Sequence, residues 1–389
     1  MKVINLLYLI PSLKNSGGME RVLTSKVNFL ANSNKYKIFI ATTEMSDRDH
    51  CFFEVNNDVE IINFELNFNT LFNFNIFSKI IETKKLLNVY EYELKKIILQ
   101  KEIDICISMG GKELEFLGNL NLPCKKIYEC HFEKNYKSKF LEIYGKNNFL
   151  WKIYGKIRDW QHFKLASKFD MVVVLSKGAF NDWKNLPNRT IIIANASPIL
   201  LNPDFKIDLY SKSIISVGNL VVVKGYDLLI DAWALIAQNY PGWTLYIYGN
   251  GELKDILQKQ INSLKLDNSV KLAGVTKDVR LKLEKSAFYV MSSRSEGLPM
   301  VLIESITCGL PIVAFDCETG PREIIENSGC GILVENGNIK KLAEAMSFMI
   351  SSKEIRAEMS KKAVEKAKDY ELNNIMQKWE QIFFEMTKK

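Results

Sequence analysis

The strongest constraint on the fold is an alternation of short apolar runs with longer segments of helical period. Residues 2–10 read KVINLLYLI, an apolar run of strand length, and residues 17–33 then carry apolar side chains along one helix face. Further strand-like runs follow at 36–43, 104–110, 125–131 and 170–176. Runs that are apolar on both faces suit buried parallel strands, and their alternation with helices predicts a doubly wound α/β architecture.

The same alternation restarts after a linker rich in proline and asparagine at residues 195–205. Strand-like runs then come at 213–220, 243–251, 270–275, 287–293 and 310–316, with helical segments at 225–240 and 252–266. We expect two Rossmann-like domains with parallel sheets, residues 1–203 and 204–369, that face each other across a cleft. Ligands of such sheets bind beyond the carboxyl ends of the strands.

Composition suits a folded two-domain protein and argues against several other classes. The 389 residues are 47% hydrophobic and 25% charged, which is enough for a large packed core. Seven scattered cysteines without CxxC spacing argue against a disulfide framework or a zinc site and favour reduced thiols in the cytoplasm. Pro11 ends the first apolar run at strand length, so neither a secretory signal nor a membrane-spanning helix is expected.

Glycines follow several of the predicted strands, at the edge where a ligand would bind. Gly17 and Gly18 separate the first strand from its helix, and paired glycines let backbone amides approach a phosphate. Gly218, Gly249 and Gly274 each end or follow a strand of the second half. None of these turns is specific by itself, because ordinary strand-to-helix turns use the same residues.

Two polar residues also stand at strand ends. Lys224 precedes a glycine and a helical segment, where it would point into the cleft and neutralise a diphosphate; a solvated loop lysine is the alternative. His131, one of three histidines, ends the run at 125–131, where a structural role is the simplest interpretation.

The segment SEGLPMVLIE, residues 295–304, places two carboxylates at the ends of an apolar run. Pro299 suits the first position of a helix and Gly309 suits its end. The free amides at the start of this helix would face an anion. Glu296 would then lie in the loop at the cleft and Glu304 about one turn into the helix. The alternative for Glu304 is a partly buried glutamate paired with a local lysine.

Together these motifs resemble the family-4 retaining glycosyltransferases, which have the GT-B fold. The segment SRSEGLPMVLIESITCGLPIVAFDCETGPREII, residues 293–325, resembles the family's Glu-x7-Glu signature, with Glu296 and Glu304 as its two glutamates. The resemblance includes the GG pair at 17–18, the VG and KG pairs within 217–225, YGNGE at 248–252 and LAG at 272–274. It covers almost the whole chain and is strongest from about 210 to 350.

The resemblance implies a role for each matched position. Glu296 would contact the donor sugar, Glu304 the ribose hydroxyls, Lys224 the donor diphosphate, and His131 would lie near the sugar. The candidate catalytic residues are therefore Glu296, Lys224 and His131. The candidate donor-binding residues are Gly17, Gly18, Gly218, Asn219, Gly249, Gly274, Gly297, Leu298, Pro299, Met300, Val301 and Glu304.

One position departs from the family's pattern, which usually has arginine after the strand glycine. The sequence VGNL places Asn219 there, and asparagine has neither the charge nor the fork of a guanidinium. Either Lys224 and helix termini hold the diphosphate without further help, or a second cation compensates. Arg294 and Arg322 are the candidates for that cation.

By resemblance, the reaction moves a hexosyl or N-acetylhexosaminyl group from a nucleotide diphosphate sugar, with UDP favoured, to a hydroxyl of a lipid-linked or polysaccharide acceptor, with retention. No cofactor and no metal ion is expected. The first domain would bind the acceptor and the second the donor, and a C-terminal helix at about 370–389 would pack back on the first domain.

Alternative functions remain open at this point. A GT-B nucleotide-sugar epimerase or a phosphorylase would share the fold, although phosphorylases are much longer and carry a pyridoxal lysine. A catalytically weak transferase-like partner subunit is suggested by Asn219. A two-lobed sugar-binding protein is a fourth interpretation, but such proteins are usually exported.

The positive charge gathers in one window, residues 134–168. It holds nine lysines and arginines, two acids and eight interleaved aromatic residues, so it accounts for the whole chain's net charge of +7. Such a mixture suits an anionic membrane surface or an acidic acceptor, and would place the protein in the cytoplasm at the inner face of the membrane. A helix pair that packs its aromatic residues inward is the alternative. No nucleic-acid-binding motif accompanies the charge.

Overall fold

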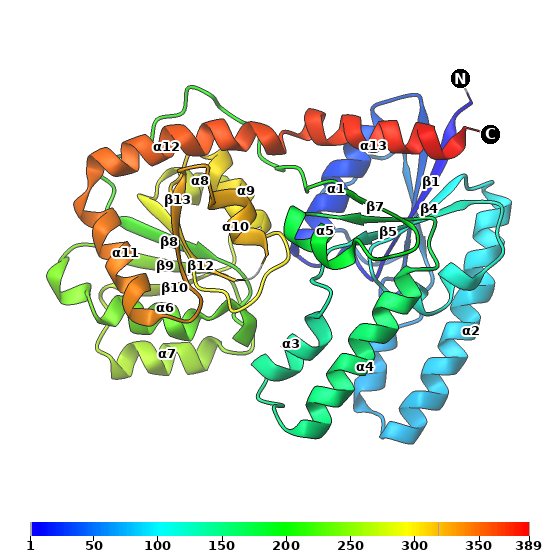
Figure 1. Ribbon diagram of the computed structural model, residues 1–389, viewed down its shortest axis with the longest axis horizontal. Coiled ribbons are helices and arrows are strands. Elements are labelled where there is room, and N and C mark those ends of the chain that lie inside the picture. The colour runs from blue at the N-terminus through cyan, green and yellow to red at the C-terminus, as the bar shows by residue number, and fades with distance from the viewer. Residues whose placement is uncertain (1, 318, 389) are drawn as a thin grey trace.

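The computed structural model describes residues 2–317 and 319–388. Within these ranges the strands form two parallel sheets, one of seven strands in the order β3-β2-β1-β4-β5-β6-β7 and one of six in the order β10-β9-β8-β11-β12-β13. Figure 1 shows the sheets in separate halves of the molecule, each enclosed by helices. The predicted architecture of two doubly wound domains is therefore confirmed.

The first sheet uses the chain up to Ile192. Its strands are β1 (Ile4–Ile10), β2 (Tyr36–Thr42), β3 (Val59–Asn63), β4 (Ile105–Ser108), β5 (Lys125–Cys130), β6 (Met171–Val174) and β7 (Arg189–Ile192). The helices between them are α1 (Gly18–Ala31), α2 (Ile76–Gln100), α3 (Tyr136–Ile143), α4 (Phe149–Ala166) and α5 (Lys177–Trp183).

The second sheet begins at Ser213. Its strands are β8 (Ser213–Val217), β9 (Thr244–Tyr248), β10 (Val270–Gly274), β11 (Phe288–Met291), β12 (Ile312–Asp316) and β13 (Gly331–Glu335). The helices are α6 (Tyr226–Ala234), α7 (Lys254–Ser263), α8 (Val279–Glu284), α9 (Met300–Thr307), α10 (Gly320–Ile325), α11 (Ile339–Ser351), α12 (Lys353–Ala367) and α13 (Leu372–Thr387).

The sequence pattern missed three strands, β3, β7 and β13, and all three lie at the edge of a sheet. Most residues of these three strands are partly buried or exposed, whereas the central strands β4, β6 and β11 are buried throughout. Edge strands are solvated along one side and need no continuous apolar run. The predicted helix at 225–240 is also shorter than expected, because α6 ends at Ala234 and a separate short turn follows.

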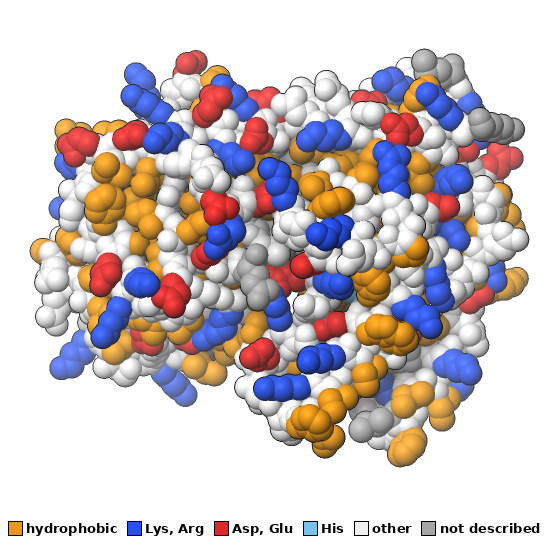
Figure 2. Space-filling view, in the orientation of Figure 1, with side chains coloured by type: hydrophobic (Ala, Val, Ile, Leu, Met, Phe, Trp, Pro, Cys, Tyr) orange, Lys and Arg blue, Asp and Glu red, His pale blue; other side chains and the backbone are white. Residues whose placement is uncertain are grey.

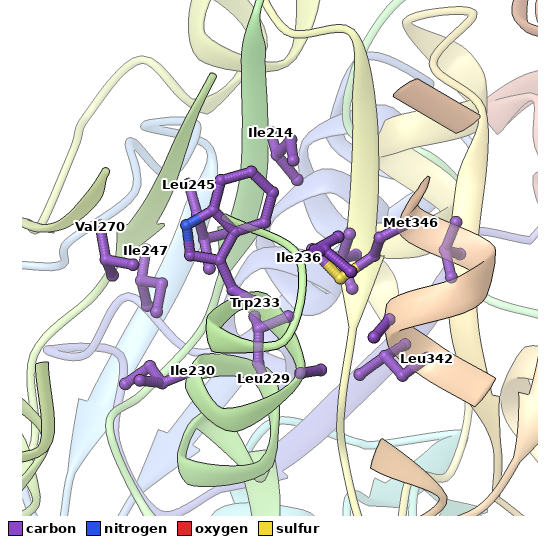
Figure 3. Packing of buried hydrophobic residues seen from close by; sticks show 14 of the residues in the cluster. Ile214, Leu229, Ile230, Trp233, Ile236, Leu245, Ile247, Val270, Leu342 and Met346 are labelled. Atoms are coloured by element: carbon purple, nitrogen blue, oxygen red, sulfur yellow. The ribbon is translucent and has the colours of Figure 1, made fainter. Parts of the chain in front are cut away.

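The core of the second domain forms between the sheet and the helices α6 and α11 (Figure 3). Trp233 and Leu229 of α6 point at strand residues such as Leu245, and Met346 of α11 closes the cluster from the other side. Trp233 is fully buried and its indole N–H donates to the hydroxyl of Ser269 at 3.1 Å. Each fully buried large apolar side chain contributes about 1.5–3 kcal/mol to the stability of the folded domain. This core holds the strands in place, and the loops of the site follow the ends of these strands.

The chain crosses back to the first domain at its end. In Figure 1, α12 and α13 run along the top of the molecule from the second domain to the first, and the two termini lie near each other. Trp379, Ile382 and Phe383 of α13 pack into the core cluster of the first sheet. The last helix therefore ties the two domains together.

Candidate active site

Three glycines meet at the carboxyl edge of the second sheet. Gly249 donates its N–H to the carbonyl of Gly274 at 2.8 Å, and Gly218 donates to the carbonyl of Tyr248 at 2.9 Å. Gly249 has a φ of +148°, and a Cβ atom there would lie 1.9 Å from the carbonyl oxygen of Gly218. No other residue fits so close an approach of two backbones. The three glycine turns that the sequence predicted are thus neighbours at one edge of the sheet, and this group of Gly218, Gly249 and Gly274 is called the glycine floor below.

Lys224 and Glu296 lie beside this floor and form an ion pair with 2.6 Å between Nζ and Oε1. Lys224 ends a short turn after β8, and Glu296 lies in the loop after β11, the neighbouring strand. The hydroxyl of Ser293 also donates to Glu296 at 2.6 Å. Gly225, with φ of +62°, lets the two loops touch, since a Cβ there would lie 2.1 Å from the carbonyl oxygen of Ser292.

The loop after Glu296 reaches the first domain. A Cβ on Gly297 would lie 2.6 Å from the carbonyl oxygen of His131, and the hydroxyl of Thr319 donates to the carbonyl of Glu296 at 2.5 Å. Leu298 is buried, so only its backbone is available to a ligand. The loop at Gly297 therefore packs directly against the backbone of His131 in the first domain.

Helix α9 begins as the sequence predicts, with one correction. Pro299 has an extended backbone and is the N-cap, so the first helical position belongs to Met300 and not to the proline. The helix amides of Met300 and Val301 precede the first intrahelical bonds, which Leu302 and Ile303 donate to Pro299. A Cβ on Gly18 would lie 3.4 Å from Cγ of Met300. The Gly17–Gly18 loop of the first domain therefore packs against the start of α9 in the second domain.

Glu304 is buried, with 4% of its surface exposed, and its partner comes from the other domain. Nη1 of Arg21, on α1, lies 3.0 Å from Oε1 of Glu304. Burial raises the pKa of Glu304 to about 7, and the positive charge of Arg21 limits this rise. The alternative of a local lysine partner is therefore wrong. Arg21 was missed because sequence spacing does not show that α1 and α9 face each other.

His131 belongs to a buried chain of ionisable groups. Its Nε2 lies 3.3 Å from Oε1 of Glu129, which itself pairs with Nζ of Lys26 at 2.6 Å. Burial opposes the charge of Glu129, but Lys26 and His131 outweigh it and hold the pKa of Glu129 down at about 2. Lys26 also lies over the ring of Trp379 on α13, 3.9 Å from its centroid. The wall of the cleft at His131 is thus anchored by the C-terminal helix.

Both arginines that the sequence offers in place of the charge missing at Asn219 are paired with acids. Asn219 is exposed at the end of β8. Arg294 is held by the carboxylate of Asp227, at 2.6 and 2.9 Å, and Arg322 is held by Asp316 and Glu326. Both candidate arginines are therefore engaged by acids of the second domain, and Lys224 is left as the predicted cation that faces Glu296.

The fold and this cleft define a GT-B type α/β protein with cations, carboxylates and helix amides gathered between two domains. The model of the family "Glycosyl transferases group 1" matches residues 202–366. A glycosyltransferase of Methanocaldococcus jannaschii is 32% identical over 336 residues, which cover 74% of this chain and 81% of that protein. The chain belongs to the group 1 glycosyltransferases, and it is an enzyme of that class.

Other similar proteins agree with this family. The amylovoran biosynthesis glycosyltransferase AmsD of Erwinia amylovora is 27% identical over 394 residues, covering 97% of this chain and 99% of that one. An N-acetylgalactosaminyltransferase of Campylobacter jejuni, whose name gives a diphospho-undecaprenol acceptor, is 31% identical over 237 residues, covering 59% of this chain and 63% of that one.

Solved structures share the fold. TarM of Staphylococcus aureus, in a complex with UDP, superimposes with a TM-score of 0.78 at 19% identity and covers 98% of this chain and 100% of its own. Sucrose-phosphate synthase of Thermosynechococcus elongatus gives 0.80 at 13% identity, covering 98% and 99%. The family match and the relatives named as glycosyltransferases do not favour the interpretation as an epimerase.

Proposed function

We propose that this chain is a retaining glycosyltransferase of cell-surface glycan synthesis. It moves a hexosyl or N-acetylhexosaminyl group from a UDP-linked donor to a hydroxyl of a lipid-linked or polysaccharide acceptor. The observation that carries the proposal is a pair of ion pairs around the start of α9: Lys224 holds Glu296 in the loop before this helix, and Arg21 of the first domain holds Glu304 within it. The acceptor named for the Campylobacter jejuni relative and the UDP of the TarM complex support the choice of acceptor and nucleotide.

Each charged group of the cleft has a task in this reaction. Lys224 and the free amides of α9 hold the donor diphosphate, since both present positive charge to the same space. Glu296 accepts hydrogen bonds from the donor sugar, and Glu304 accepts them from the ribose hydroxyls. Without a donor, Lys224 and Arg21 neutralise these two carboxylates. Donor binding therefore exchanges ion pairs within the protein for contacts with the ligand.

The chemical step needs no protein nucleophile. The bond from the anomeric carbon to the diphosphate oxygen breaks, and a bond to the acceptor oxygen forms on the same face of the sugar. The leaving diphosphate takes the acceptor's proton, and Lys224 stabilises the charge that develops on it. No metal ion is required in this scheme. His131, across from Gly297, borders the sugar and helps to exclude water.

A membrane surface is part of the proposal. Helix α4 buries small and polar side chains, namely Gly155, Asp159, His162 and Ala166. Its large apolar side chains point outward instead, with Phe149, Leu150 and Trp160 exposed by 76%, 74% and 60%. Figure 2 shows hydrophobic and basic side chains gathered over the lower ends of α2, α3 and α4. Such a surface suits a bilayer with anionic lipids.

The alternative for residues 134–168, a helix pair with its aromatic residues packed inward, fits Tyr136 and Phe163 but not the other aromatic residues. Helix α3 has no buried residue, and a Cβ on Gly155 of α4 would lie 2.8 Å from Cα of Ser138. The two helices thus meet through small residues. Six of the eight aromatic side chains are exposed, whereas Tyr136 and Phe163 are half-buried. Among the described residues, no helix is both long and apolar enough to cross a membrane.

The experiment that tests the proposed function is turnover of the Lys224→Ala variant. Release of UDP from UDP-hexoses and UDP-N-acetylhexosamines is measured with bacterial lipid extract as the source of acceptor. We expect the wild type to release UDP, and Lys224→Ala to lose release by at least about a hundredfold with an unchanged unfolding midpoint. Lys282→Ala, on α8, is the matched control. Near-normal turnover of Lys224→Ala would show that the diphosphate lies elsewhere.

A further inference from the structure

A cavity lies within the first domain, apart from the donor loops. It has a volume of about 730 Å³ and opens between α4 and the carboxyl ends of β1, β2 and β4. The strand side is formed by Pro11, Thr43 and Gly110, and the helical side by the cations Lys137, Arg158 and Lys164. Two carboxylates also line it: Glu44 accepts from the N–H groups of Phe68 and Asn69, and Glu115 pairs with Lys112. A site at this edge of a parallel sheet is where a ligand of the domain is expected.

The cations of this cavity have few partners within the protein. Among the described residues, no carboxylate lies within ion-pair distance of Lys137 or Arg158, and Arg158 donates only to the amide oxygen of Gln161 at 3.1 Å. The nearby carboxylate of Asp159 accepts from the N–H groups of Lys137 and Ser138 and from the Ser138 hydroxyl. The Asp159 carboxylate thus accepts hydrogen bonds from the first turn of α3, and these N–H groups offset part of its negative charge.

Burial and the charge of neighbouring cations act together on these groups. The pKa of Lys137 is lowered by burial and then by Arg158 and Lys112. Lys112 itself lies 3.4 Å from Glu115 and so is partly neutralised. Like charges that are held together and partly desolvated favour an anion between them.

His162 adds a polar atom without a partner. Its side chain is 7% exposed and lines the cavity, and its Nε2 lies 2.8 Å from the hydroxyl of Tyr128. Its Nδ1 is buried and has no hydrogen-bond partner among the described residues. Burial, Lys137 and Arg158 lower the pKa of His162 to about 4, so the ring is neutral at pH 7. When Nε2 accepts from Tyr128, Nδ1 carries the proton, and this buried N–H is left without an acceptor among the described residues.

The cavity lies between the exposed apolar surface and the reaction site. Arg158 is eight residues beyond Leu150 on α4, or about 12 Å along the helix axis. With Leu150 among acyl chains, Arg158 would lie at the depth of phosphate groups. On the other side, Tyr136 of the cavity wall stacks on Phe132 at 4.8 Å, directly after His131.

We propose that this cavity binds the phosphate or diphosphate group of the acceptor, and that the acceptor is carried on a lipid whose chain continues along the exposed face of α4. The inference rests on the proposed function, because it assigns the acceptor side of the same reaction. A phosphate within a polyol-phosphate polymer has the same chemistry, but it would leave the apolar face of α4 unused.

The test is calorimetric titration with geranyl diphosphate, inorganic diphosphate and geraniol. We expect geranyl diphosphate to bind wild type, and the Lys137→Gln/Arg158→Gln variant to lose about tenfold in affinity for each cation removed. Arg158→Gln alone alters an exposed side chain, so it keeps the test valid if the double variant folds poorly. Lys361→Gln/Lys362→Gln, on α12, is the matched control for the loss of two positive charges. Lys224→Ala is the control for diphosphate that binds at the donor site instead of in the cavity.

The outcomes separate the claim of a phosphate site in this cavity from the claim that the acceptor is carried on a lipid. Undiminished affinity in Lys137→Gln/Arg158→Gln, or binding lost only in Lys224→Ala, would overturn the phosphate site. Equal affinity for geranyl and inorganic diphosphate would overturn the lipid carrier, as would equal binding of geraniol. Stabilisation by nucleotide sugars is read on the same samples. If they stabilise the wild type while Lys137 and Arg158 have no effect on diphosphate binding, this inference fails and the proposed function stands.

Discussion

Glu304 gives the two-domain cleft a pH dependence whose sign and size follow from its surroundings. Its pKa is raised by burial to about 7 from a usual value of 4.5. Between pH 4.5 and pH 7 the folded state keeps the proton on Glu304 while the unfolded state releases it. The stabilisation that Glu304 contributes therefore falls as the pH rises through this range. A shift of this size corresponds to about 3 kcal/mol of unfolding free energy, present below pH 4.5 and lost above pH 7.

The assay compares wild type with Glu304→Gln, which cannot titrate. Urea unfolding is followed by tryptophan fluorescence from pH 4.5 to 8, and the difference in unfolding free energy cancels the other carboxylates. We expect the wild type to lose about 3 kcal/mol relative to Glu304→Gln across this range. In the background of Arg21→Gln the loss should continue above pH 7, because the compensating charge is gone. A difference that stays flat with pH would refute a buried, titrating Glu304.

Two further predictions concern the floor of the site and the basic surface. Gly249→Ala should destabilise the protein by at least about 2 kcal/mol and abolish stabilisation by nucleotide sugars, because its Cβ would meet the carbonyl of Gly218 at 1.9 Å. Gly274 has a φ of +72°, but a Cβ added there would have no atom within 4 Å, so Gly274→Ala should lower the free energy of unfolding by only about 1 kcal/mol. Equal destabilisation by the two substitutions would contradict the close approach of Gly249 to Gly218. Replacing three exposed lysines of α4 (Lys152, Lys156 and Lys164) by glutamine should lower the affinity for liposomes with anionic lipid about a hundredfold, as measured by flotation. The same replacement at three lysines of the second domain (Lys340, Lys361 and Lys362) is the control and should leave flotation unchanged. Flotation that is unaffected by the first set would exclude the membrane role of this surface.

The sequence predicted the parts of the site that depend on local pattern. Helix α9 has a proline before it, an apolar run within it and a glycine of φ +60° after it, and these local signals are sufficient to place Glu304 about one turn in. The central strands were predicted because they are buried on both faces. Edge strands such as β3 and β13 were not, because their exposed side chains break the apolar run.

Contacts that depend on tertiary arrangement were not available from the sequence. Lys224 meets Glu296 because β8 and β11 are neighbours in the sheet, although 72 residues separate the pair in the chain. Arg21 meets Glu304 only because the domains close on each other. The composition of residues 134–168 indicated a basic aromatic surface, but only the helix orientation shows that α4 turns its aromatic side chains outward.

The central claim is that the cleft between the domains binds a nucleotide sugar through Glu304 and Lys224. The most direct measurement is a thermal-shift screen of wild type and Glu304→Ala against UDP-, GDP- and ADP-sugars. The account predicts that a UDP-sugar raises the unfolding midpoint of the wild type by several degrees, as expected for ligand near a hundred times its Kd, and that Glu304→Ala loses most of this rise. If no nucleotide sugar stabilises the wild type, or if Glu304→Ala is stabilised equally, the donor site described above is wrong.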